Sequence, residues 1–142
     1  MNNKETTMTT ASKTWLDRAH ATAGRAMTLA TEDVAEARSK LADETKPLEW
    51  GPSILEDGIK AEHLLACWKA WVTAIEGTEG MGTPEERTIR ATRRMHDWAL
   101  DQLTRDTEYA RLKDHAQRKA QQEFYRSMVQ ILEIAGGEVA RG

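Results

Sequence analysis

Two residues that could bind a metal lie four positions apart in an apolar stretch. His63 and Cys67 would share one face of a helix, the arrangement in which two side chains hold one zinc ion. A zinc site needs further ligands, but His20, His96 and His115 stand at no motif spacing from this pair. A small buried core residue is the simpler interpretation of Cys67, which has leucine and tryptophan around it. We therefore predict neither a metal nor another cofactor.

A histidine followed by an aspartate is the second candidate for chemistry. His96-Asp97 is the dipeptide of the HD-type phosphohydrolases, an all-helical family, but no wider pattern of that family accompanies it. On a helix, His96 falls near Ile89, Leu100 and Leu103. This surrounding indicates a half-buried structural histidine.

An acidic segment is the third candidate. Residues 32–36 (EDVAE) are similar to the paired acidic motif of helical nucleotide pyrophosphohydrolases, which need a second Glu-x-x-Asp cluster to complete a magnesium site. The glutamates of the next segment, Glu49, Glu56 and Glu62, have no aspartate three residues later. A solvated helix turn is the better interpretation. With these candidates set aside, we predict that the protein is not an enzyme.

The overall composition predicts one ordinary folded domain. The chain has 142 residues, 39% of them apolar and 30% charged. The longest apolar run, Leu64 to Trp68, is too short to span a bilayer, and the first ten residues contain no apolar segment of a secretory signal. A single cysteine excludes an intramolecular disulfide. We expect a cytoplasmic protein without a membrane partner.

Charge divides the chain into two parts. The formal net charge is −3, from 20 basic and 23 acidic residues. Residues 1–84 hold nine basic and 13 acidic side chains, whereas residues 85–126 hold ten basic and eight acidic ones. A globally basic nucleic-acid-binding protein is therefore not supported, but a local basic surface in the second half is.

The basic residues of the second half follow helix geometry. At about 100° per residue, five of them share a sector of the last helix, opposite its apolar side. The resulting stripe is about 22 Å long, enough to follow several phosphates without reading bases. A solubilising helix face is the alternative interpretation. The predicted nucleic-acid-binding residues are Arg111, His115, Arg118, Lys119 and Arg126 on the last helix, with Arg87, Arg90, Arg94 and Arg105 on the preceding one.

Apolar residues outside the expected core predict a protein interface. One tryptophan lies at the edge of the arginines of the preceding helix, where it suits base stacking or a protein-binding hot spot. Near the C-terminus a second apolar strip lies beside Phe124 and Ile131, more than one helix–helix contact requires. We expect it to be buried against another subunit, with self-association as one form of this. The predicted partner-binding residues are Trp98, Tyr125, Met128, Val129 and Leu132.

Helices must position all of these residues, because strand patterns are absent throughout the sequence. From Thr14 to Leu41 apolar residues recur at steps of three and four, mostly as alanine, although Gly24 and Thr31 could divide this helix. After a loop with prolines, Ser53 and Glu56 fit a capping box that opens a helix apolar all round, which we expect at the centre of the core.

A stronger helix start precedes the second half. Thr83 and Pro84 are a cap and a first helical residue, followed by Glu86. One helix from Pro84 to Ala135 would be about 78 Å long, against a radius of gyration of about 14–15 Å for a compact domain of this size. We therefore predict a break between Thr104 and Thr107, where Asp106 or Thr107 could cap a new helix.

These patterns together predict an all-α fold, a compact or slightly elongated bundle of four to five helices. We expect a flexible arm over residues 1–12, one helical domain over 13–135 and a flexible tail over 136–142.

The layout resembles the small helical subunit of type III CRISPR RNA-guided effector complexes. Members of that family carry a proline followed by a motif such as Ile-Leu-Ser-Asn-Gly-Leu, which opens an apolar helix. In this sequence Pro52 is followed by residues 54–59 (ILEDGI) and then by an apolar run. The family also ends in a helix with an early tyrosine and a later aromatic and arginine group, as Tyr109 and residues 124–126 (FYR) do.

The resemblance implies a non-catalytic role in defence against invading nucleic acid. Such subunits stack along the complex and hold the RNA guide–target duplex against neighbouring protein subunits. The competing hypothesis is a helical protein-binding module, an adaptor or inhibitor of a phage or mobile element. It accounts equally for the five tryptophans, the surplus apolar surface and the negative net charge.

Overall fold

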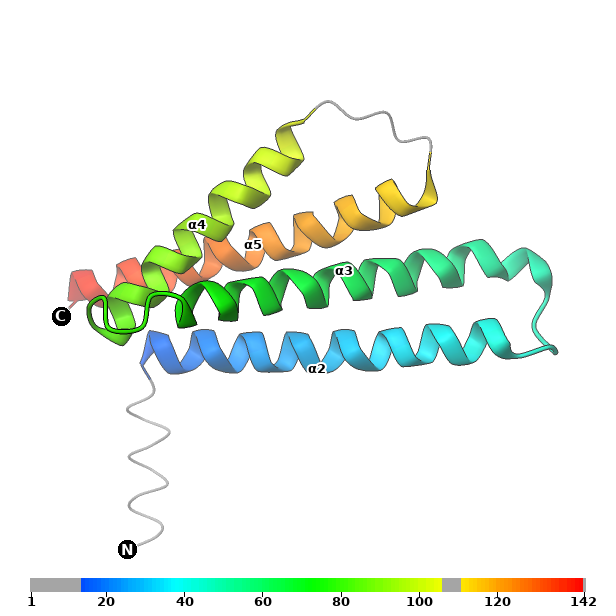
Figure 1. Ribbon diagram of the computed structural model, residues 1–142, viewed down its shortest axis with the longest axis horizontal. Coiled ribbons are helices and arrows are strands. Elements are labelled where there is room, and N and C mark those ends of the chain that lie inside the picture. The colour runs from blue at the N-terminus through cyan, green and yellow to red at the C-terminus, as the bar shows by residue number, and fades with distance from the viewer. Residues whose placement is uncertain (1–13, 106–110, 142) are drawn as a thin grey trace, which may run out of the picture.

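The part of the chain that the structure describes forms a bundle of four long α-helices. The computed structural model describes residues 14–105 and 111–141, with side chains up to residue 137. The helices are α2 (Trp15–Ala42), α3 (Gly51–Glu76), α4 (Pro84–Thr104) and α5 (Leu112–Arg141), and a short 3-10 helix, η1 (Leu48–Trp50), precedes α3 (Figure 1). Within that part of the chain there is no strand, and the predicted all-α fold is confirmed.

Helix α2 begins at a capping box and continues without a break. The Asp17 backbone N–H donates to Thr14 Oγ1 at 3.2 Å, and the Thr14 N–H donates to Asp17 Oδ2 at 3.3 Å. Neither Gly24 nor Thr31 divides the helix, because Gly24 keeps helical geometry and the Thr31 hydroxyl donates to the Met27 carbonyl at 2.8 Å. The alternative of two helices in this region is wrong.

Helix α3 starts differently from the prediction. It begins at Gly51, directly after η1, and the N-cap residue Trp50 makes no side-chain capping bond. The predicted capping box of Ser53 and Glu56 is wrong, because the Glu56 carboxylate accepts a hydrogen bond from Lys119 of α5 instead. The cap of α4 is confirmed, with the Glu86 N–H donating to Thr83 Oγ1 at 3.1 Å.

The predicted break in the second half is confirmed, since α4 ends at Thr104 and α5 begins at Leu112. Both expected caps, Asp106 and Thr107, lie outside the described residues, as does the predicted arm over 1–12. Helix α5 runs on to Arg141, beyond Ala135, where we expected the bundle to end. Gly136 does not interrupt it.

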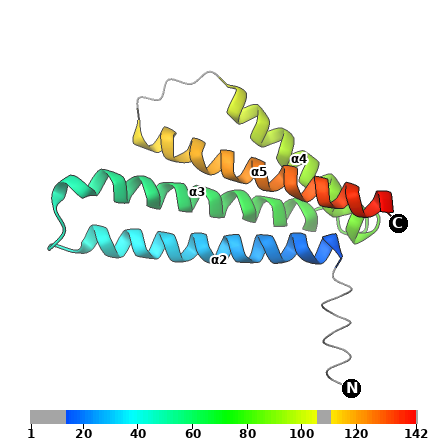
Figure 2. The ribbon, with the colours of Figure 1, turned by 180° about the vertical axis from the view of Figure 1, so that it is seen from behind.

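Helix α3 occupies the middle of the bundle. Antiparallel α2 lies along one side of α3, and α5 runs parallel to α3 on another side (Figures 1 and 2). Helix α4 packs across the C-terminal part of α5 and diverges from α3 towards its own C-terminal end. Helix α2 touches α5 over a short stretch only, so most of α2 is held by α3 alone.

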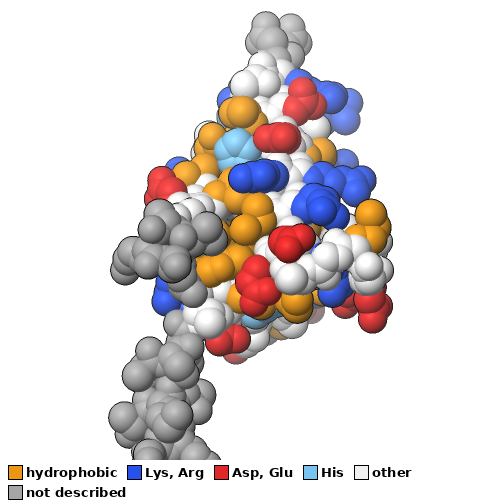
Figure 3. Space-filling model, turned by 90° about the vertical axis from the view of Figure 1, so that its left-hand side faces the viewer, with side chains coloured by type: hydrophobic (Ala, Val, Ile, Leu, Met, Phe, Trp, Pro, Cys, Tyr) orange, Lys and Arg blue, Asp and Glu red, His pale blue; other side chains and the backbone are white. Residues whose placement is uncertain are grey.

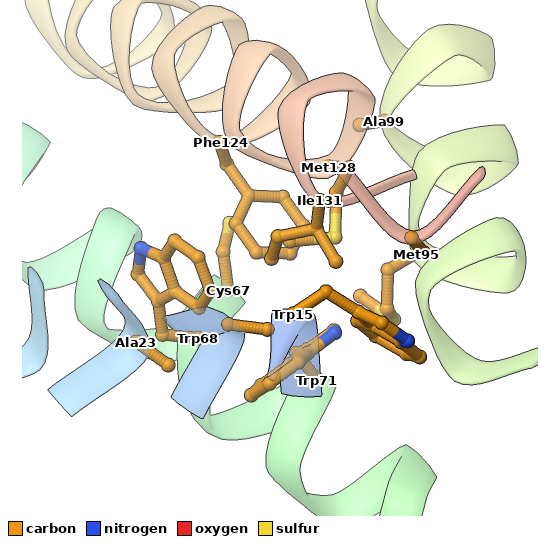
Figure 4. Packing of buried hydrophobic residues seen from close by; sticks show 12 residues of the cluster. Trp15, Ala23, Cys67, Trp68, Trp71, Met95, Ala99, Phe124, Met128 and Ile131 are labelled. Atoms are coloured by element: carbon orange, nitrogen blue, oxygen red, sulfur yellow. The ribbon is translucent and has the colours of Figure 1, made fainter. Parts of the chain in front are cut away.

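The core gathers aromatic side chains from three helices. The Trp68 ring meets Trp71 at 5.6 Å and Phe124 at 5.3 Å, both edge to face, and Met95 of α4 joins this cluster (Figure 4). The Trp71 indole N–H donates to the Thr92 hydroxyl at 2.9 Å, so a buried polar group has its partner. The prediction that α3 is the central core helix is confirmed.

Candidate functional site

The five basic residues predicted on the last helix do not form one continuous surface, and one of them, Arg111, lies just before α5. Arg118 Nη2 donates to the Leu103 carbonyl at 2.8 Å and so satisfies the last turn of α4. Lys119 Nζ lies 2.5 Å from Glu56 Oε1, and this hydrogen bond raises the pKa of the lysine. Arg111, His115 and Arg126 are exposed. The stripe is therefore interrupted in its middle by Lys119, which is neutralised by Glu56, while Arg118 is turned towards the end of α4.

The arginines of α4 divide in the same way. Arg87 Nη2 donates to the Ile75 carbonyl at 3.0 Å, and Arg90 Nη1 donates to the Met81 carbonyl at 3.4 Å, so both fasten the turn between α3 and α4. Carbonyls are neutral, and neither of these two arginines forms an ion pair with a described residue, whereas Arg105 is neutralised by Asp101 at 2.9 Å. Arg94 is exposed. At the end of the molecule where α4 begins, Lys and Arg side chains are mixed with Asp and Glu (Figure 3).

The apolar strip of α5 is partly covered by the protein itself. Met128 is fully buried in the core with Met95 of α4, so its predicted role in partner binding is wrong. Tyr125 is half-buried and stacks on His96 at a ring distance of 5.0 Å. The prediction was wrong for a tertiary reason: α4 packs across this strip in the folded protein, and the sequence around the strip does not reveal that contact. The other predicted partner-binding residues keep some exposed surface; they are Trp98, Val129 and Leu132.

The structure places the His63–Cys67 pair and His96 among neighbouring side chains of the bundle. Cys67 is buried, and burial raises the pKa of its thiol to about 12. His63 Nε2 lies 3.3 Å from the Gln121 side-chain amide, while burial and the charge of Lys113 lower the pKa of His63. His96 is half-buried and contacts Asp97 at 3.0 Å, as the structural interpretation predicts. Among the described residues no group of three or more His, Cys, Asp or Glu is placed to hold a metal.

A groove between α2 and α3 was not predicted. It has a volume of about 350 Å³ and lies between the C-terminal part of α2 and the N-terminal half of α3, with one residue of α5 at its edge. We call it the α2–α3 groove. Small and apolar side chains line it along both helices: Ala26, Leu29, Ala30, Ala37, Ile54, Ala61 and Leu64. Charged side chains form its rim: Asp33, Glu36, Lys40, Asp57, Lys60 and Glu123.

Two features of the sequence shape this groove. Alanines at 30 and 37 let α2 lie close to α3, and a Cβ added at Gly58 would be only 2.9 Å from the Ala37 Cβ. Leu29 projects at the groove edge with 59% of its surface exposed. The alanine seam did predict a close helix contact, but not that α5 would leave the C-terminal part of α2 uncovered. An apolar lining with polar groups at its edges is the usual form of a ligand-binding or partner-binding pocket.

Exposed apolar side chains continue at the end of the molecule where α2 passes to α3. Leu48 is 96% exposed and Trp50 50% exposed, with Lys46 Nζ 5.7 Å from the Trp50 ring centre. Leu41 and Leu55, which are also exposed, directly follow the groove residues Lys40 and Ile54. Clustered exposed apolar residues mark interaction sites more often than isolated ones do.

Comparison with known proteins finds no family model, no curated protein and no solved structure that matches this chain. The resemblance to the small subunit of type III CRISPR complexes therefore stays a prediction. None of the described helices combines the length and the apolar character that crossing a bilayer requires.

Proposed function

We propose that this protein is a non-catalytic helical interaction module that binds a protein partner in the α2–α3 groove. The observation that carries the proposal is the groove itself, an apolar hollow with a charged rim. One of its two walls is α2, a helix that packs mainly on α3. Hot spots of protein interfaces are apolar pockets surrounded by polar residues, and this groove has that form.

The exposed leucine of the groove supports the same function. Leu29 keeps 59% of its surface in contact with water, although alanines on both sides of it in the sequence pack against α3. Burying a leucine completely is worth about 1.5–3 kcal/mol, so covering the exposed part of Leu29 would contribute about 1–2 kcal/mol to binding. That is a substantial part of the affinity of a modest interface.

The test compares two leucine variants of the tagged full chain, purified from its native host with quantitative mass spectrometry. Leu29→Glu places a charge at the groove, and Leu100→Glu is the matched control because Leu100 is 40% exposed on α4. We expect one protein whose recovery falls about five- to twentyfold with Leu29→Glu and stays unchanged with Leu100→Glu. Equal recovery with both variants, or equal loss, would contradict the proposal.

A second candidate function, binding of an RNA backbone, is favoured by a specific observation. Arg87 and Arg90 are held in position by neutral carbonyls and form no ion pair with a described residue, and they share α4 with the exposed Arg94. Fixed guanidinium groups suit phosphate contact. This candidate corresponds to the subunit of a ribonucleoprotein complex that the resemblance implies.

Fluorescence anisotropy with a labelled RNA of mixed sequence, at two salt concentrations, tests this candidate. The variant Arg94→Glu/Arg126→Glu removes two exposed arginines that form no ion pair with a described residue. When the logarithm of the binding constant is plotted against the logarithm of the salt concentration, each phosphate contact should add about one unit of negative slope. The variant should reduce the size of this slope by about two units. Binding that the variant leaves unchanged would exclude these arginines as the RNA contacts.

A further inference from the structure

The rim of the α2–α3 groove has more acidic than basic side chains. It carries four carboxylates and two lysines. Both lysines are already paired: Lys40 Nζ lies 2.9 Å from Glu36, and Lys60 Nζ lies 3.4 Å from Glu123. This pairing uses two of the four carboxylates.

The remaining two carboxylates line the groove from different helices. Asp33 belongs to α2 and Asp57 to α3, and both are exposed. Neither forms an ion pair with a side chain in the described part of the chain. The pKa of Lys40 is raised chiefly by its hydrogen bond to Glu36, and the charge of Asp57 adds a smaller contribution. An occupant of the groove thus meets an excess of negative charge on both sides.

The form of the groove favours a helical occupant. Its wall on α2 runs from Ala26 to Lys40, about 21 Å, which equals about 14 residues of helix. The walls are helices whose backbone groups are bonded internally, so they offer no strand edge to a partner. A partner segment must then satisfy its own backbone hydrogen bonds, and an amphipathic helix does so while burying one apolar face.

We propose that the α2–α3 groove binds a cationic amphipathic helix of a protein partner. Apolar side chains at i, i+3 or i+4 and i+7 of that helix lie on the lining formed by Ala30, Ile54 and Leu64. Lysine or arginine residues on its two flanks face Asp33 and Asp57. This inference rests on the proposed function and adds the chemical class of the partner.

A display library of 14-residue helical peptides tests the proposal. Leucine is fixed at the three apolar positions i, i+4 and i+7, and the other positions carry Lys, Glu, Ser and Ala at equal frequency. Peptides are selected on the full-length chain, with the uncharged variant Leu29→Ser as counter-selection so that only groove-dependent binders remain. We expect the selected pool to have a net positive charge.

Two charge-reversed chains then locate the interaction. The variant Asp33→Lys/Asp57→Lys should weaken a selected peptide at least about fourfold, since each exposed ion pair and each like-charge contact changes affinity modestly. The matched control Glu32→Lys/Glu79→Lys makes the same change of charge outside the groove and should change affinity less than about twofold. Circular dichroism confirms that both variants are helical.

The outcomes separate this inference from the proposed function. Selected peptides that are neutral or acidic, or a peptide whose affinity the two reversals change equally, overturn the cationic helix while leaving the groove as a binding site. The absence of any groove-dependent peptide overturns both.

Discussion

The close contact of α2 and α3 that shapes the groove can be tested with one methyl group. A Cβ built at Gly58 would lie 2.9 Å from the Cβ of Ala37, whereas a Cβ built at Gly24 meets nothing within 4 Å. Both glycines lie inside helices, so Gly→Ala gains about 0.5–1 kcal/mol of helix stability at either position. Only at Gly58 does the new methyl group also push two helices apart.

The cost of the close contact is the difference in unfolding free energy between these two variants. Ala37 Cβ is attached to the backbone and cannot rotate away, so the helices themselves must shift, and such overpacking costs about 1–3 kcal/mol. Gly58→Ala should therefore be about 1–3 kcal/mol less stable than Gly24→Ala, because the gain in helix propensity cancels in this comparison. Relative to wild type, we expect Gly24→Ala to be more stable and Gly58→Ala to be about 0–2.5 kcal/mol less stable.

Urea unfolding at 25 °C, followed by circular dichroism at 222 nm and by tryptophan fluorescence, measures these free energies. The double variant Ala37→Gly/Gly58→Ala moves the methyl group from one helix to the other and should lie within about 1 kcal/mol of wild type. Equal stabilisation by Gly24→Ala and Gly58→Ala would refute the close contact, and with it the geometry of the groove.

Three further predictions concern buried polar groups. Thr92→Val removes the acceptor of the Trp71 indole N–H and should lower the free energy of unfolding, measured in urea, by about 1–3 kcal/mol. When Trp71 is already replaced by Phe, the same Thr92→Val substitution should cost less, because no indole N–H is left without its acceptor. Cys67, with a thiol pKa raised to about 12 by burial, should react with a thiol reagent at pH 8 only after unfolding, and rapid reaction of the native protein would contradict its burial. Burial lowers the pKa of His63, so the unfolded chain binds a proton more readily; stability should fall as the pH drops below about 6.5, and His63→Gln should flatten this dependence between pH 7 and 5.

Local signals in the sequence predicted much of the fold. The start of α4 is set by Thr83 and Pro84, which act on backbone groups within one turn, so no tertiary information is needed. The break after Thr104 follows from helix length against domain size. The position of α3 at the centre follows from its apolar residues on all sides.

Features that depend on distant residues were not predictable in the same way. Glu56 fits a capping box locally but bonds to Lys119, which is 63 positions away in the sequence. Met128 has the pattern of an exposed interface residue until α4 folds across α5. The α2–α3 groove exists because α5 leaves the C-terminal part of α2 uncovered, and no pattern within α2 shows where another helix will end its contact.

Occupancy of the α2–α3 groove in the native host tests the central claim most directly. The photo-crosslinking amino acid p-benzoylphenylalanine is placed at Leu29, which edges the groove, and in a separate chain at Ala70, which is exposed on α3 outside it. After irradiation, we expect one discrete protein adduct from position 29, mapped by mass spectrometry to a helical segment of the partner, and none from position 70. No adduct from position 29, or the same adducts from both positions, would contradict the claim that this groove is the site of protein binding.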